Sequence, residues 1–192
     1  FFTSAGKEFL LVNPWNYIPK NYNPTLVSLG RFKMAEECFA PLEQMLADCE
    51  AAGLSPKIRS AYRTNSDQKW LFIRDVDKYM DEGYSEEEAE RLTALKTAVP
   101  GTSEHQLGLA FDIVDTDNQN LSEDQQHTKV QKWLMEHCWE YGFILRYPDG
   151  KTEKTGIIYE PWHYRYVGVE LAMELRDSGL CLEEYIEQLT QE

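Results

Sequence analysis

Three side chains in two separate segments of the sequence could together hold a metal ion. His105 and Asp112 lie in SEHQLGLAFDIV, and His163 lies further along the chain in EPWHYR. The aspartate sits within an apolar run, where a buried carboxylate needs a paired charge or a metal ion. Two imidazoles and one carboxylate that leave a fourth position open are the donors of a catalytic zinc site, whereas structural zinc sites are closed by four protein ligands. These residues therefore predict a catalytic zinc site.

Glu160 comes three residues before His163 and is a candidate general base. A carboxylate beside a metal ion, but not bound to it, can take a proton from a metal-activated water molecule. Taken singly, each residue has a more ordinary interpretation: Asp112 could pair with an arginine, and Glu160 could be a solvated charge. The conjunction of imidazoles and acids in two apolar or aromatic segments favours a site. His127 and His137 lie on a predicted polar helix and receive no functional role.

The elements that must position these residues follow no regular alternation of strand and helix. Apolar runs predict strands at 9–12, 57–62, 109–115, 143–147 and 156–160, the last two forming a hairpin around a PDG turn. Apolar periodicity and capping signatures predict helices at 25–52, 68–80, 83–99, 122–141, 168–177 and 181–190. This order favours an α+β fold, in which a small antiparallel sheet carries helices mainly on one face.

The composition describes a folded, acidic protein. The chain has 192 residues, of which 42% are hydrophobic, and its formal net charge is −14. The apolar content is sufficient for a core, and the length favours one domain over residues 1–192. A surface of this charge repels phosphate backbones and anionic lipids, so we expect neither nucleic-acid binding nor docking on anionic lipid. The sequence contains no apolar run long enough to span a bilayer, so we expect no membrane insertion by this segment, and it contains no secretory leader pattern.

The cysteines predict no structural zinc knuckle, because Cys38, Cys49, Cys138 and Cys181 form no C-x-x-C pair. If Cys38 and Cys49 share a helix, about 16 Å of rise separates them. A disulfide needs Cα atoms within about 7 Å, so these two could not bridge. A bridge between Cys138 and Cys181 stays open on geometry. We expect four buried free thiols, since free cysteine behaves as a small core residue.

Taken together, the motifs resemble those of the zinc D-alanyl-D-alanine carboxypeptidases of the VanY type and their LdcB-like L,D-carboxypeptidase relatives. SEHQLGLAFD matches the family pattern S-x-H-x-x-G-x-A-x-D, and EPWH matches E-x-W-H. The upstream segment SAYRTNSDQ resembles S-x-Y-R-x-x-x-x-Q, and LLVNPWNYIP resembles the usual start of the domain. The resemblance covers nearly the whole chain, with one small departure at Ala61, where glycine is common.

The resemblance implies a role for each matched residue. His105, Asp112 and His163 would bind one zinc ion per chain, and Glu160 would be the catalytic base. Arg63 would bind the substrate's carbonyl or terminal carboxylate, for which a forked guanidinium is well suited. The other matched side chains would bind the terminal residue of the substrate: Tyr62, Gln68, Ser103 and Trp162.

Two further arginines, Arg59 and Arg165, are reserve candidates for anion binding or structural ion-pair partners. In a chain of net charge −14, the arginines of the site must create a local positive potential at the cleft. Gly108, between two of the proposed ligands, would let the chain bend close to the metal. The resemblance implies the small α+β fold that these D,D-peptidases share with Hedgehog N-terminal domains. A helical insert at 77–98 is expected to be either a lid over the cleft or scaffold.

The function that the resemblance implies is removal of the terminal D-alanine from peptidoglycan stem peptides. Such substrates lie outside the bacterial membrane, so we expect a secreted or tethered protein whose leader is absent from this sequence, and a monomer. D,D- and L,D-specificity both stay open. Two alternatives also remain: an endopeptidase of the same fold, and a zinc-holding wall-binding module without turnover. Glu160 and Arg63 argue against the module, which needs neither a base nor an oxyanion donor.

Overall fold

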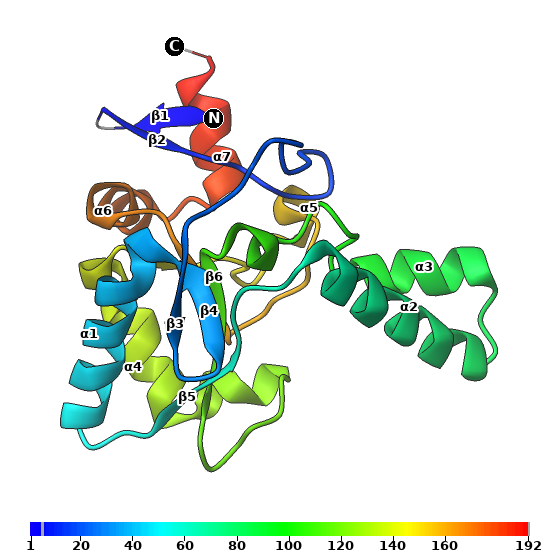
Figure 1. The fold of residues 1–192 in the computed structure, drawn as a ribbon, viewed down its shortest axis with the longest axis horizontal. Helices are drawn as coiled ribbons and strands as arrows, with labels where there is room; N and C mark the ends of the chain where they lie inside the picture. Colours follow the sequence, from blue (N-terminus) through cyan, green and yellow to red (C-terminus); the bar gives the residue numbers. More distant parts are fainter. Residues whose placement is uncertain (5, 192) are drawn as a thin grey trace.

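A computed structural model describes residues 1–4 and 6–191 and has an α+β architecture, as the sequence predicted. Its central element is a four-stranded sheet in the order β5-β6-β8-β7, and every neighbouring pair is antiparallel. The strands are β5 (Pro56–Ser60), β6 (Ala110–Asp115), β7 (Phe143–Leu145) and β8 (His163–Tyr166). Figure 1 shows helices packed beside this sheet.

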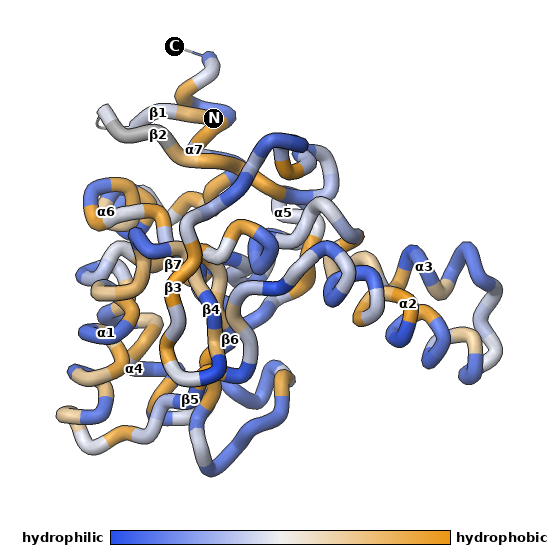
Figure 2. The backbone as a smooth tube through the Cα atoms, viewed as in Figure 1, coloured by the Kyte–Doolittle hydropathy of each residue, from blue (hydrophilic) through white to orange (hydrophobic). Residues whose placement is uncertain are grey.

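The main hydrophobic core lies between the sheet and two helices, α1 (Phe39–Ala51) and α4 (Lys129–His137). Side chains alternate across a strand. Phe111 and Ile113 of β6 therefore enter this core, and Asp112 between them projects to the opposite face. Figure 2 shows hydrophobic segments gathered around the sheet and mostly hydrophilic chain in the loop that follows β6.

A second apolar cluster joins the two ends of the described chain to the sheet. It combines Phe9 and Leu11 with Ile144 of β7 and with residues of two helices, α6 (Val169–Ser178) and α7 (Leu182–Leu189). The hairpin of β1 (Phe2–Ser4) and β2 (Lys7–Phe9) lies beside α7 (Figure 1). The remaining short helices are η1 (Glu36–Cys38), η2 (Glu104–Leu107), η3 (Glu123–His127), η4 (Cys138–Tyr141) and α5 (Thr152–Thr155).

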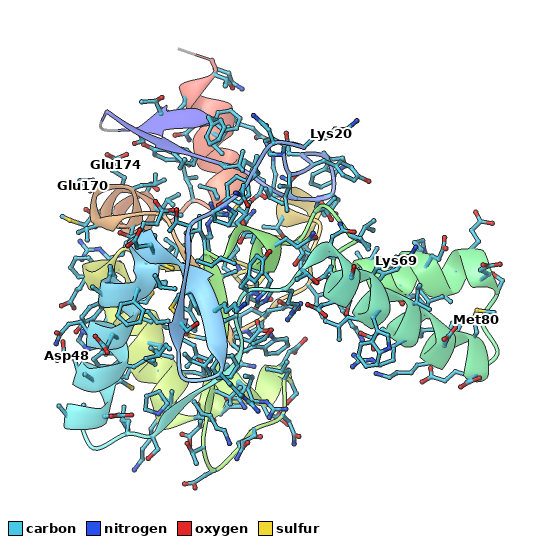
Figure 3. All side chains as sticks on the ribbon, in the orientation of Figure 1. Lys20, Asp48, Lys69, Met80, Glu170 and Glu174 are labelled. Carbon is cyan, nitrogen blue, oxygen red and sulfur yellow. The ribbon has the colours of Figure 1, made fainter. Side chains whose placement is uncertain are left out.

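Two packed helices, α2 (Asn65–Asp81) and α3 (Glu86–Ala94), project from the body as an arm (Figure 1). The cap of α2 is Thr64, which forms a reciprocal capping box with Asp67. Figure 3 places Met80 near the tip of the arm and Lys69 nearer to its base. The predicted insert at 77–98 takes in the end of α2 and all of α3.

The first half of the helix predicted at 25–52 is wrong. The structure has an antiparallel hairpin of β3 (Leu26–Leu29) and β4 (Phe32–Ala35), and α1 begins only at Phe39. Gly30 adopts a positive φ of 58° in the hairpin turn, a conformation that glycine reaches without strain. The apolar residues of the hairpin happen to recur at helical intervals, which misled the prediction.

The strand predicted at 156–160 is also absent, and β7 pairs instead with β8. Gly156 has a positive φ of 78°, which turns the chain after α5. Two backbone bonds then hold the segment without a ladder: Ile158 N–H donates to Leu95, and Glu160 N–H donates to Tyr147. The strand predicted at 9–12 ends at Phe9, and the helix predicted at 122–141 is divided into η3, α4 and η4.

The prediction of four buried free thiols is confirmed: Cys38, Cys49, Cys138 and Cys181 are all buried and unbridged. Burial raises the pKa of the Cys38 thiol to about 12, so it stays protonated at neutral pH. Its Sγ donates to the carbonyls of Ala35 and Gly108, which ties η1 to the turn before β6. Among residues 1–4 and 6–191, the helices are all too short or too polar to cross a membrane.

Candidate active site

Strand pairing brings the predicted metal ligands together. Asp112 on β6 lies directly opposite His163 on β8 and opposite Ser60 on β5. His105 lies on η2, which ends at Gly108 in the left-handed conformation before the chain enters β6. A Cβ at Gly108 would lie 2.8 Å from the backbone nitrogen of Ala35. The glycine therefore permits a close approach to the neighbouring hairpin, rather than to the metal site as the sequence suggested.

The three side chains are buried and form one potential metal site, with ligand atoms that all lie within 4.8 Å of one another. Oδ1 of Asp112 is 3.3 Å from Nε2 of His105 and 3.1 Å from Nδ1 of His163. Nδ1 of His105 is 2.8 Å from the carbonyl oxygen of Ala61. A carbonyl can only accept, so this nitrogen carries the proton, and Nε2 of the neutral ring presents a lone pair to the site.

This arrangement fits a divalent cation. The lone pairs of His105 Nε2 and Asp112 Oδ1 point to the same place as Nδ1 of His163. Three such atoms repel one another unless a proton or a metal ion lies between them. In the metal-free protein a proton fills this role: burial lowers the pKa of His163, but the hydrogen bond to Asp112 and the nearby carboxylate of Glu104 outweigh it and raise that pKa to about 9. A metal ion would replace this proton. Two nitrogens and one oxygen are donors that suit zinc.

Glu160 is placed beside this site as a candidate proton acceptor. Its side chain is buried, and Oε2 lies 3.7 Å from Nδ1 of His163. The backbone N–H of Glu160 donates to the carbonyl of Tyr147, which fixes its position in an irregular segment. Burial raises the pKa of Glu160 to about 8, although the neighbouring His163 opposes this shift. A carboxyl group held at this place beside a metal site can both accept a proton and return it.

Arg63 holds the aspartate in position and faces the same cavity. Its guanidinium donates to Oδ2 of Asp112 at 2.9 Å, to Ser60 at 2.9 Å and to Gln68 at 3.1 Å. Asp112 therefore gives one oxygen to the arginine and turns the other toward the histidines. Burial raises the pKa of Asp112, but His105 and Arg63 outweigh it and hold that pKa well below its usual range.

A cavity of about 1040 Å³ opens over these groups. It is lined by the three proposed ligands together with Arg63, Glu160, Ser103 and Trp162. Side chains of the arm form another part of its wall: Leu71, Arg74, Asp75, Lys78, Tyr79 and Thr93. Tyr62 and Gln68 are not among the described residues that line it. Gln68 is fully buried behind Arg63, where its amide donates to the Ala98 carbonyl.

Several residues of the site were missed by the sequence analysis. The ring of Tyr147 lies 4.7 Å from that of His163 and lines the cavity. The sequence predicted only a strand at 143–147 and no functional role for this residue. Arg165, a reserve candidate for anion binding, is instead buried in an ion pair with Glu104. Arg59, the other reserve candidate, does line the cavity. No motif marked Tyr147 or Glu104, because burial of single polar residues is set by tertiary packing.

Comparisons with known proteins agree with this geometry. Residues 31–169 match the family model described as VanY, D-alanyl-D-alanine carboxypeptidase. A D-alanyl-D-alanine carboxypeptidase of Enterococcus faecalis is 42% identical over 183 residues, covering 93% of this chain. The chain spans 65% of the length of that relative.

Two solved structures share the fold at high similarity. A variant of the vancomycin-resistance D,D-pentapeptidase VanY, in complex with Zn(II), superimposes with a TM-score of 0.84 at 40% identity, covering 92% of this chain and 97% of its own. The LdcB LD-carboxypeptidase superimposes with a TM-score of 0.80 at 35% identity, covering 92% of this chain and 84% of its own. The predicted fold is thereby confirmed.

Proposed function

The chain belongs to the VanY family of D-alanyl-D-alanine carboxypeptidases, as its motifs predicted, and we propose that it is a zinc-dependent carboxypeptidase that removes the terminal D-alanine from peptidoglycan stem peptides. The observation that carries this proposal is the convergence of His105, Asp112 and His163 beside Glu160. A bare metal-binding module has no use for a buried carboxyl group with a raised pKa next to its ligands.

In the proposed mechanism, His105, Asp112 and His163 hold the zinc ion, and Glu160 moves protons. A zinc ion held by these residues would supply a Lewis acid for the scissile carbonyl and would lower the pKa of water to about 7. Glu160 accepts the proton of the attacking water and returns it to the leaving amine.

Arg63 is the proposed anchor for the substrate. Each terminal nitrogen of a guanidinium carries two N–H groups. One on each nitrogen is used, for Gln68 and Asp112, so one on each is left for the carboxylate or carbonyl oxygen of the substrate. Ser103 and Trp162 form walls of the same cavity, and we propose that they contact the terminal residue. Gln68 would act on the substrate indirectly, through its hydrogen bond with Arg63. Tyr62, whose backbone N–H donates to the carbonyl of Lys33, would act only by holding the chain next to Arg63.

We propose that the substrate is met outside the bacterial membrane, because stem peptides of the wall are located there. We further propose that the domain acts as a monomer in which residues 1–192 form one catalytic unit. We propose that 77–98 acts as a lid rather than as scaffold, and this is supported by side chains of the arm that line the cavity, such as Lys78 and Thr93.

The decisive experiment is mass spectrometry of a pentapeptide stem and a tetrapeptide stem after incubation with the zinc-loaded protein. We expect loss of one alanine from the pentapeptide, in keeping with the D,D-specific relative of 42% identity. Loss from the tetrapeptide alone would reassign the specificity to L,D, and internal cleavage would indicate an endopeptidase. If zinc binds and neither peptide changes, the protein is a binding module and the proposal is refuted.

A further inference from the structure

Two buried polar atoms face each other next to the proposed metal site without a conventional hydrogen bond. Among the described residues, buried side-chain atoms without a hydrogen-bond partner are Nε2 of His163, Oε2 of Glu104 and Oγ1 of Thr93. The first two are 3.7 Å apart. Buried polar groups are nearly always paired, so an isolated nitrogen and an isolated carboxylate oxygen at this separation are natural partners.

Glu104 is held in place by two arginines. Its other oxygen, Oε1, accepts from Nε of Arg146 at 2.8 Å and from a terminal nitrogen of Arg165 at 2.9 Å. The side chains of all three residues are at most 1% exposed. Both cations therefore bind one oxygen, which leaves Oε2 directed toward His163 and unable to turn away without breaking two charged contacts.

The ion pairs extend from Glu104 to the C-terminal helix. The terminal nitrogens of Arg146 donate to both oxygens of Glu183, on the first turn of α7, at 2.8 and 2.6 Å. The other terminal nitrogen of Arg165 donates a hydrogen bond to the carbonyl of Leu10. Two carboxylates thus balance two guanidinium groups in this buried cluster, which we call the Glu104 network: Glu104, Glu183, Arg146 and Arg165.

We propose that Glu104 is a positioning residue for the metal site, because its Oε2 accepts the Nε2–H of His163. This contact would fix the proton on Nε2 and present the lone pair of Nδ1 to the metal ion. Ligating histidines commonly donate their second ring nitrogen to a carboxylate in this way, which sets both tautomer and ring orientation. The inference rests on the proposed zinc site and not on the peptidase reaction.

A matched pair of isosteric variants tests the proposal. Glu104→Gln and Glu183→Gln each remove one negative charge from the Glu104 network, but only Glu104 faces His163. In the first variant the two arginines still require an acceptor at one end of the amide. The NH₂ group must therefore point at Nε2 of His163, which favours the tautomer that cannot ligate through Nδ1.

Zinc affinity is measured by competition with a chromophoric chelator. We expect Glu104→Gln to weaken binding about 10- to 100-fold, in the range seen for such outer-shell partners, and Glu183→Gln to leave it unchanged. Long-range ¹H–¹⁵N spectra of the zinc-loaded wild type and of Glu183→Gln should show a slowly exchanging proton on Nε2 of His163. The melting temperature of each variant shows how much stability is lost when one negative charge is removed from the Glu104 network.

Equal loss of zinc affinity in the two variants would overturn the proposal, because the network would then serve stability alone. A proton found on Nδ1 of His163 in the zinc-loaded wild type would overturn it as well. If Glu104→Gln does not fold, Glu104→Asp replaces it as the test, because it keeps the negative charge and moves the carboxylate away from Nε2 of His163. We expect this variant to fold and to bind zinc more weakly than the wild type does. A wild type that binds zinc but hydrolyses no stem peptide would refute only the proposed function.

Discussion

Replacement of Glu160 by glutamine should abolish most turnover while leaving zinc in place. The change is isosteric, and Glu160 is not one of the three proposed ligands. General acid–base catalysis by one group contributes about 10²–10⁴-fold. We expect the upper half of this range, because the two other carboxylates described in contact with His163 are held by other partners. Asp112 is committed to Arg63 and the histidines, and Oε2 of Glu104 faces the far nitrogen of His163.

The expected loss in kcat is therefore about 10³–10⁴-fold, equivalent to about 4–5.5 kcal/mol in the activation free energy. The assay is release of D-alanine from a pentapeptide stem, with zinc content measured on the same preparation. Glu123→Gln is the matched control, since Glu123 also lines the cavity but lies on η3 and is exposed. The reasoning is refuted if Glu160→Gln retains more than about a tenth of the wild-type kcat with zinc bound.

Three further predictions concern the metal site and its frame. His163→Ala should lose zinc, and one zinc per chain in metal analysis of that variant would contradict the ligand set. In the folded metal-free protein the pKa values of His163 and Glu160 are raised to about 9 and 8. From pH 6.5 upward the folded state therefore binds more protons than the unfolded state, and its free energy of unfolding falls as the pH rises. Its melting temperature should fall as pH rises from 6.5 through 9, and saturating zinc should reduce this slope. Gly108→Ala should destabilise the protein by about 2–4 kcal/mol in denaturant unfolding, through left-handed strain and contact with Ala35. Gly150→Ala, which has open space around its Cβ, should cost only about 1–2 kcal/mol, and equal losses would contradict this account.

The proposed ligands could be found from the sequence because each is a residue type that an apolar segment rarely contains without a reason. Asp112 interrupts a buried strand, and His163 follows a tryptophan in another buried segment. The sheet then brings them together by register alone, since Asp112 and His163 are direct partners across β6 and β8. Local chemistry and the order of the strands were sufficient for this part of the site.

The elements that the sequence analysis misassigned are those whose apolar residues satisfy two periodicities. Between Leu26 and Ala35, apolar residues are spaced for one face of a helix, yet they also fit a two-stranded hairpin around Gly30. Ile157 and Ile158 are apolar because they line the cavity beside the arm and the site, not because they pair in a sheet. Long-range packing decides such cases, and a single sequence does not contain it.

The charge of the site shows the same division between local and tertiary information. The sequence predicted a local positive potential at the cleft of a chain of net charge −14, but it did not indicate which cations produce this potential. The structure places five at the cavity: Arg59, Arg63, Arg74, Lys78 and Lys96. Arg74 and Lys78 share Asp75, which reduces their field, and Arg63 already neutralises Asp112. Two different roles follow. Arg63 can bind an anion only at short range through its two remaining donors. Under the proposed function, Arg59 and Lys96, which line the same cavity, would add longer-range attraction for a C-terminal carboxylate.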